Sequence, residues 1–229
     1  MTFYPVPIVE GETEVECFER LLHLVWERIL NAADRLQVAE PFRGKRGSLI
    51  DPTHPSFLQK IEEASRTLAR LLRRDPSGRG LVLLLLDAER DCVRQLVATL
   101  LPALRPIRPD LPIACVLAKQ MFENWIVAGA STLAGVNGLP NPLPRRHDFE
   151  GHNGAAWLDE QMRSQRPPRK YRKTIDAIVF VRAMDLRECR ENSPSFNKLC
   201  RVLEGQLPPP DEPPTEEVTP QPQEEQTDA

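Results

Sequence analysis

The stretch that decides the fold is Leu81–Leu86, LVLLLL, which runs directly into the charged sequence DAERD at residues 87–91. An unbroken apolar run of this length, without the alternation of a half-exposed strand, is typical of a strand buried on both faces. Strands of this kind occur in parallel sheets that lie between two layers of helices. The sudden change to acidic residues at Asp87 marks the end of the strand.

The same order of strand and then helix recurs along the chain. The apolar run Val6–Val9 precedes apolar residues at the three- and four-residue spacing of a helix face, namely Val15, Phe18, Leu22, Val25 and Ile29. Further strands are expected at Leu36–Ala39 and Ile113–Ala118, and further helices at Pro55–Arg74, Cys92–Leu101 and about Phe122–Leu133. The sequence therefore predicts an α/β fold with a mainly parallel sheet and helices on both faces.

Composition divides the chain into three regions. We expect residues 1–134 to form the α/β core, and residues 135–205 to belong to the same domain as an irregular insertion followed by helices. The insertion, Gly135–Pro168, is rich in Gly, Pro and Asn, with one short predicted helix at Ala155–Met162. The helices predicted after it are Lys173–Met184, Asp185–Glu191 and Pro194–Leu203.

The C-terminal tail, residues 206–229, differs from the rest of the chain in its charge. It holds seven acidic residues and seven prolines but no Lys or Arg, and such a composition cannot bury enough apolar surface to become ordered. We therefore expect the tail to be disordered. Residues 1–205 then carry a formal net charge of +4, against -3 for the whole chain, which permits a polyanion such as nucleic acid as a partner.

The chain shows no sequence feature that directs it to a membrane. Its longest apolar run, Leu81–Leu86, is far too short to span a bilayer, and the N-terminus lacks the basic and then apolar pattern of a secretory leader. We expect a cytoplasmic protein without a membrane partner. The sequence does not predict the oligomeric state.

Acidic residues follow three of the predicted strands. Glu10 follows the first strand, the DAERD acids Asp87, Glu89 and Asp91 follow Leu81–Leu86, and Glu123 lies shortly after Ile113–Ala118. Because the carboxyl ends of parallel strands share one edge of the sheet, these carboxylates should gather there, where α/β folds usually bind ligands. Their repulsion would be offset by a divalent cation, and Mg²⁺ or Mn²⁺ suits oxygen ligands without clustered His or Cys.

Each acid also has a simpler interpretation. A single Asp after a strand is more often the cap of the next helix than a metal ligand, and Glu123 can equally be a ligand or a cap. Glu12, Glu16 and Glu19 are best explained by a helix N-terminus or by a solvated helix face. The metal hypothesis therefore depends on the acids acting together.

Two motifs resemble the halves of the TOPRIM site, which is found in topoisomerases, primases and OLD-type nucleases. They are IVEGETE at residues 8–14 and LLLLDAERD at residues 83–91. In that family a Glu after the first strand and an Asp-x-Asp after a later strand gather Mg²⁺ for phosphodiester chemistry. The resemblance implies a Rossmann-like TOPRIM fold, with Glu10 as the first Glu, Asp87 as the first Asp and Glu14 as the second Glu of OLD-type sequences.

One position departs from the TOPRIM pattern. Residue 89 is Glu where that pattern prefers Asp, so this ligand is one methylene longer. A carboxylate on the longer side chain still reaches a metal, but a two-metal geometry is less secure. Asp91 can substitute as a ligand, or the site can bind metal without efficient cleavage.

A wider pattern is similar to an uncharacterised bacterial TOPRIM-like family, over about residues 5 to 204. It includes FENW at 122–125, YRKT at 171–174 and SPSFNKL at 193–199. Members of that family are often encoded beside ATPases, which implies a role in antiphage or mobile-element defence with an ATPase partner. The resemblance implies a Mg²⁺-dependent nuclease acting on DNA or RNA, whose catalytic residues are Glu10, Asp87, Glu89 and Lys173. The alternative is a non-catalytic binding or regulatory subunit of an ATPase complex.

Two basic segments are candidate contacts to phosphate. Residues 163–173 contain six cations and Tyr171, and they form either a phosphate-binding arm or a solvated loop. Lys173, at the end of this segment, could stabilise charge on a transferring phosphoryl group. Arg43, Lys45 and Arg46 follow the second predicted strand and therefore lie near the same edge of the sheet, although a plain surface loop is the simpler interpretation.

Overall fold

The computed structural model describes residues 1–207, so the predicted tail lies outside the described residues from position 208 onward. Its centre is a sheet in which every strand pairing is parallel, with the order β2-β1-β4-β5, and β3 also pairs with β1. The strands are β1 (Thr2–Val9), β2 (Arg35–Leu36), β3 (Phe42–Arg43), β4 (Arg79–Asp87) and β5 (Ile113–Ala118). The predicted α/β class with a mainly parallel sheet is confirmed.

The apolar run that suggested this fold forms the middle of the sheet. Side chains of β4 alternate between two hydrophobic clusters, with Leu83 and Leu85 in one and Leu84 and Leu86 in the other. Because both faces of the strand are covered, every position from Leu81 to Leu86 has to be apolar. This double burial explains the lack of alternation in the sequence.

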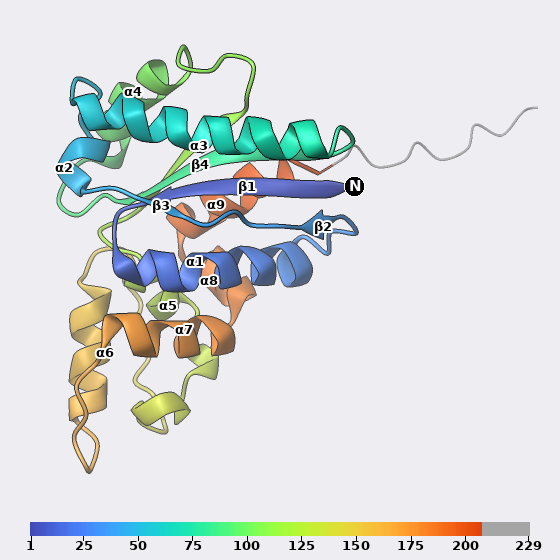
Figure 1. Cartoon of the computed structure of the whole chain (residues 1–229). Coiled ribbons are helices and arrows are strands. Elements are labelled where there is room, and N and C mark those ends of the chain that lie inside the picture. Colours follow the sequence, from blue (N-terminus) through green and yellow to red (C-terminus); the bar gives the residue numbers. More distant parts are fainter. Residues whose placement is uncertain (208–229) are drawn as a thin grey trace, which may run out of the picture.

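Helices cover both faces of the sheet (Figure 1). On one side α3 and α4 pack on β1, β4 and β5, and on the other side α1 and the helices from α5 onward form the larger hydrophobic cluster. None of the helices within residues 1–207 is long and apolar enough to cross a membrane. The helices are α1 (Glu12–Leu24), continued by the π-helix η1 (Val25–Ile29), α2 (Arg46–Leu49), α3 (Pro55–Arg74), α4 (Val93–Leu104), α5 (Glu123–Ala128), the 3₁₀ turns η2 (Ala130–Thr132) and η3 (Val136–Gly138), α6 (Gly154–Arg163), α7 (Lys173–Ala183), α8 (Leu186–Asn192) and α9 (Pro194–Glu204).

The strand predicted at Leu36–Ala39 is shorter in the structure and is followed by a second short strand. The backbone of this segment donates hydrogen bonds to the carbonyls of β1, from Gln37 to Phe3 and from Ala39 to Pro5, each at 3.0 Å. Pro5 and Pro7 have no N–H to return on this edge of β1. Between β2 and β3 this segment donates hydrogen bonds to β1, and the two prolines of β1 donate none in return. Regular strand pairing with β1 therefore remains only in β2 and β3.

The helix predicted at Phe122–Leu133 ends early, at Ala128. The next residue, Gly129, lies against the start of α8, where an added Cβ would be 2.4 Å from the carbonyl oxygen of Asp185. The amide of Asp185 also donates a 2.9 Å hydrogen bond to the carbonyl of Gly129. This close backbone approach ends α5, and a short 3₁₀ turn replaces the rest of the predicted helix.

Shortening a leucine in the centre of β4 should destabilise the whole fold. Leu84 is fully buried, so Leu84→Ala should lower the free energy of unfolding by about 2–5 kcal/mol. The matched control is Leu58→Ala on α3, where the side chain is 47% exposed and the expected change is within about 0.5 kcal/mol. Urea unfolding of both variants measures the difference, and equal effects would contradict the central position of β4.

Candidate functional site

The carboxyl ends of β1, β4 and β5 meet at one edge of the sheet, where they surround a cavity of about 440 Å³. Glu10 directly follows β1, Asp87 is the last residue of β4, and Glu123 is the first residue of α5, after β5. The structure thus brings together six of the seven side chains predicted from the sequence. The six that line the cavity are Glu10, Glu14, Asp87, Glu89, Glu123 and Lys173.

Asp87 lies at the centre of this arrangement. Its Oδ1 accepts a 2.8 Å hydrogen bond from the backbone amide of Phe122, which precedes α5. The next helix along the chain, α4, has Cys92 at its N-cap and no side-chain cap, so Asp87 does not cap that helix. Burial raises the pKa of Asp87 well above its usual value, and the nearby acids Glu14, Glu123 and Glu10 raise it further.

The glycine of IVEGETE makes room for an acidic side chain. A Cβ at Gly11 would lie 2.3 Å from Oε2 of Glu14, so a larger residue would displace this carboxylate. Glu14 is buried in the first turn of α1, with 5% exposure. Burial raises its pKa, whereas the backbone amides of Glu14 and Gly11 lower it. The structure therefore places Glu14 at the helix N-terminus and in the cavity at the same time.

Two carboxylate oxygens in the cavity accept no hydrogen bond, although they are buried. One is Oε1 of Glu123, a residue with 1% exposure, and the other is Oε2 of Glu10. Lys173 Nζ lies 3.2 Å from the Glu123 oxygen, close enough for an ion pair but outside hydrogen-bonding geometry. A buried oxygen without a hydrogen bond is costly, so both oxygens are suited to accept a ligand.

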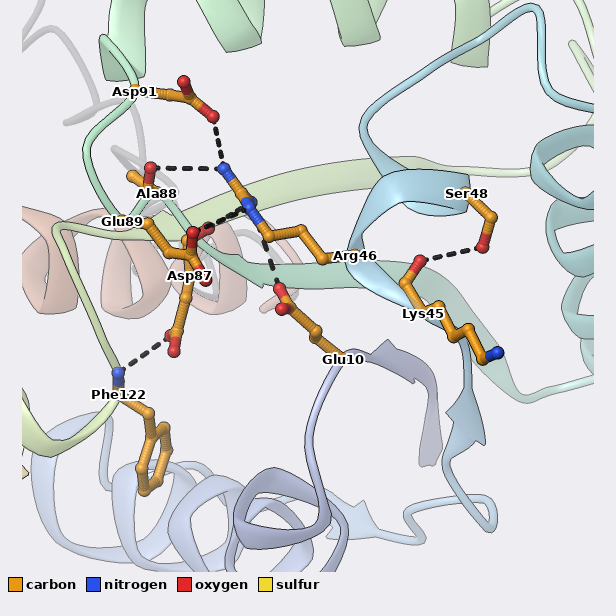
Figure 2. A network of polar contacts seen from close by, with 9 residues as sticks. All are labelled: Glu10, Lys45, Arg46, Ser48, Asp87, Ala88, Glu89, Asp91 and Phe122. Carbon is orange, nitrogen blue, oxygen red and sulfur yellow. Dashed lines mark hydrogen bonds and ion pairs between the residues drawn. The ribbon is translucent and has the colours of Figure 1, made fainter.

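Arg46, which the sequence placed near this edge only as a candidate phosphate contact, reaches into the acidic cluster from α2 (Figure 2). Its Nη1 donates a 2.7 Å hydrogen bond to the carbonyl of Asp87, and its Nη2 donates to the carbonyl of Ala88 and to Asp91. Its Nε lies 3.3 Å from Glu89 Oε2, and its Nη1 lies 3.9 Å from Glu10 Oε2. The simpler interpretation of Arg46, a plain surface loop, is wrong.

Asp91 and Glu89, which follow β4, differ in their position relative to the acidic cavity. Asp91 is half exposed, pairs with Arg46 and lines a neighbouring groove rather than the acidic cavity. Glu89 has a φ of 48°, in the left-handed region, and its amide donates a 2.8 Å hydrogen bond to the carbonyl of Gln120. A non-glycine residue in this conformation costs about 1–3 kcal/mol, so the surrounding contacts hold Glu89 there.

The basic segment 163–173 contributes one side chain to the cavity. Arg163 pairs with Asp159 at 2.6 Å, and Arg169 pairs with the fully buried Asp176. Tyr171 is 6% exposed and packs in the hydrophobic core, so it offers no ring for stacking on a base. Lys173, the first residue of α7, is the member of this segment that reaches the cavity.

The carboxylates do not form a ready metal site in the arrangement described. Within residues 1–207, no group of three or more His, Cys, Asp or Glu side chains is placed so that it could hold a metal ion. Instead, two cations of the protein lie among the acids, Arg46 beside Glu10 and Glu89, and Lys173 beside Glu123. A metal would require side-chain rotations within the cavity.

Fold and cavity together define a parallel α/β protein with buried acids at the carboxyl edge of its sheet. The family described as a domain of unknown function, DUF4276, matches residues 9–204, and the chain belongs to this family. The matched range contains all seven side chains predicted from the sequence. No curated protein and no solved structure matches the chain.

The acidic cavity should make the stability of the metal-free protein depend on pH. Burial raises the pKa of Glu10 from 4.5 to about 7, against the opposing effect of Arg46. The folded protein then binds more protons than the unfolded chain between these two values, so its free energy of unfolding should fall as the pH rises from about 4.5 to about 7. Glu14 and Asp87, whose pKa values are also raised, should add to this fall.

Replacing Glu10 should flatten this pH dependence, because Glu10→Gln removes one of the titrating groups. Urea unfolding in EDTA at several pH values measures the slope. Glu16→Gln, at an exposed position of α1, is the control and should leave the slope as in the unmodified protein. An identical slope for Glu10→Gln would show that Glu10 is not the group responsible.

Proposed function

We propose that this protein is a metal-dependent nuclease that cleaves phosphodiester bonds of DNA or RNA, with Mg²⁺ or Mn²⁺ at the acidic cavity. The observation that carries the proposal is the meeting of acids from three separate segments, the partly buried Glu10 and Asp87 and the buried Glu123, at the edge where parallel α/β sheets bind ligands. The resemblance of residues 8–14 and 83–91 to the TOPRIM motifs supports the same conclusion. The DUF4276 family match carries no activity with it.

The chemistry of the cavity suits a hard divalent cation. Its acidic lining offers carboxylate oxygens without His or Cys, which favours Mg²⁺ or Mn²⁺ over zinc. Two of these oxygens are buried and accept no hydrogen bond, those of Glu10 and Glu123. We assign Glu10, Asp87 and Glu89 as the principal ligands, with Glu14 and Glu123 beside them and Asp91 as a substitute ligand. A bound metal would orient water and offset charge on the attacking and leaving oxygens.

Lys173 has a separate role in this proposal. Its side chain is 53% exposed, and its amine lies at the cavity beside Glu123. From this position it can move toward a phosphate group and stabilise the negative charge that develops on the phosphoryl oxygens. The net charge of +4 on residues 1–205 permits nucleic acid as a partner, although the whole chain carries -3.

A second candidate function is a non-catalytic binding or regulatory subunit of an ATPase complex. The observation that favours it is a groove of about 1060 Å³ that runs beside β5 and between α4 and α9. In the described part of the chain β5 pairs with β4 alone, so its outer edge is open. Val93, Val97 and Leu101 of α4 give this groove an apolar wall against which a strand of a partner could pack. Stabilisation by metal without cleavage of any nucleic acid would favour this candidate.

Asp87→Asn tests the principal proposal, because it keeps the shape of the side chain and removes its charge. In EDTA the variant should be as stable as the unmodified protein or more stable, since one buried charge is lost. The stabilisation by millimolar Mn²⁺ should shrink or vanish, and nuclease activity should fall by at least about 100-fold. Thermal melts with EDTA or Mn²⁺, and cleavage assays on DNA and RNA, measure these effects.

Asp110→Asn is the matched control for this experiment. Asp110 is exposed and precedes β5, at the opposite edge of the sheet. This variant should respond to Mn²⁺ like the unmodified protein. If Asp87→Asn also responds in that way, the cavity is not the metal site and the proposal fails.

A further inference from the structure

Arg46 divides its contacts between two kinds of partner (Figure 2). Its hydrogen bonds go to the backbone carbonyls of Asp87 and Ala88 and to the carboxylate of Asp91, which does not line the acidic cavity. Its looser ion pairs go to Glu10 and Glu89, both of which line the cavity. Hydrogen bonds to two carbonyls and to Asp91 therefore hold the guanidinium in place, while its positive charge offsets the charges of Glu10 and Glu89.

The looser contacts involve two of the acids that a metal would need. The Nε of Arg46 lies 3.3 Å from Glu89 Oε2, and its Nη1 lies 3.9 Å from Glu10 Oε2, which is buried and accepts no hydrogen bond. The side chain of Arg46 is only 15% exposed, so water screens these interactions less than it would at the surface. A second cation on the same carboxylates would be repelled by the guanidinium.

We propose that Arg46 is an internal competitor of the divalent metal, so that metal binding requires Glu10 and Glu89 to leave Arg46. This inference rests on the proposed metal site. The hydrogen bonds of Arg46 to the backbone carbonyls of Asp87 and Ala88 and to Asp91 use no carboxylate of the principal ligands. These hydrogen bonds therefore persist when the carboxylates of Glu10 and Glu89 turn toward a metal. Arg46 thereby offsets part of the negative charge of the cavity and lowers its affinity for metal.

If Arg46 competes with the metal, removing it should change the affinity for Mn²⁺ in the opposite direction to removing a residue that supports the metal site. If Arg46 only held the ligands in place, its removal would weaken metal binding. As a competitor, its removal should strengthen Mn²⁺ binding, and we expect about a tenfold lower dissociation constant for Arg46→Ala because one nearby positive charge is lost. Titration of Mn²⁺ alone, followed by the electron paramagnetic resonance of the free ion, measures this constant without any nuclease assay.

Arg43→Ala is a demanding control, because it removes the same charge from the same cavity edge. Arg43 lines the cavity, but its guanidinium pairs with the exposed Glu12 at 2.8 Å rather than with Glu10 or Glu89 side chains. Both partners of this pair are more than half exposed, so its charge is well screened. The dissociation constant for Mn²⁺ should stay within about twofold of that of the unmodified protein.

Thermal melts give a second readout that does not depend on the titration. Arg46→Ala should melt lower than the unmodified protein in EDTA, since Glu10, Glu89 and Asp91 then lose their counter-charge. Mn²⁺ should raise its melting temperature by more than that of the unmodified protein. Arg46→Gln, which can still donate to a backbone carbonyl, serves the same test if the alanine variant does not fold.

The outcomes separate this inference from the proposed function. Tighter Mn²⁺ binding by the Arg46 variants, with Arg43→Ala unchanged, supports the inference. If the unmodified protein binds Mn²⁺ and the Arg46 variants bind it equally or more weakly, the inference is overturned and the proposed metal site stands. If none of the proteins binds Mn²⁺ or is stabilised by it, both are overturned.

Discussion

The parallel pairing of β1 with β4 is the constraint on which the rest of the structure depends. The two strands run side by side over seven residue pairs, from Phe3 with Arg79 to Val9 with Leu85. Because they point in the same direction, the residues that follow them have to emerge at the same edge of the sheet. Apolar side chains cover the faces of both strands, and Glu10 and Asp87 are neighbours at this edge although they are far apart in the sequence.

A cluster of buried acids is tolerated here because the protein supplies its own positive charges. Arg46 comes from the short helix α2 and Lys173 from the start of α7, so the two cations enter the cluster from different parts of the chain. Glu10 and Glu123 each lie beside one of these cations, which offsets the strongly unfavourable energy of an unpaired buried charge. Rearrangement at this cavity therefore has to exchange one cation for another.

Features that depend on local pattern could be predicted from the sequence, and features that depend on distant packing could not. Helix α3 and strand β5 have the bounds expected from their apolar spacing. The edge of the sheet at which the acids gather followed from strand direction alone. By contrast, the contact of Arg46 with the end of β4 joins residues about forty positions apart and depends on how α2 packs. The left-handed backbone of Glu89 had no glycine to indicate it, because hydrogen bonding to a neighbouring loop imposes it.

The two prolines of β1 have a consequence for self-association. An open strand edge offers N–H and C=O groups to which another chain can add, and this is a common start of aggregation. On the edge of β1 that faces β2 and β3, Pro5 and Pro7 remove donors where the short strands leave the pairing incomplete. A foreign strand would find too few partners there to extend the sheet. Strand β5, IACVLA, carries no proline and pairs with β4 alone within the described residues, so its outer edge is the aggregation-prone side of this sheet.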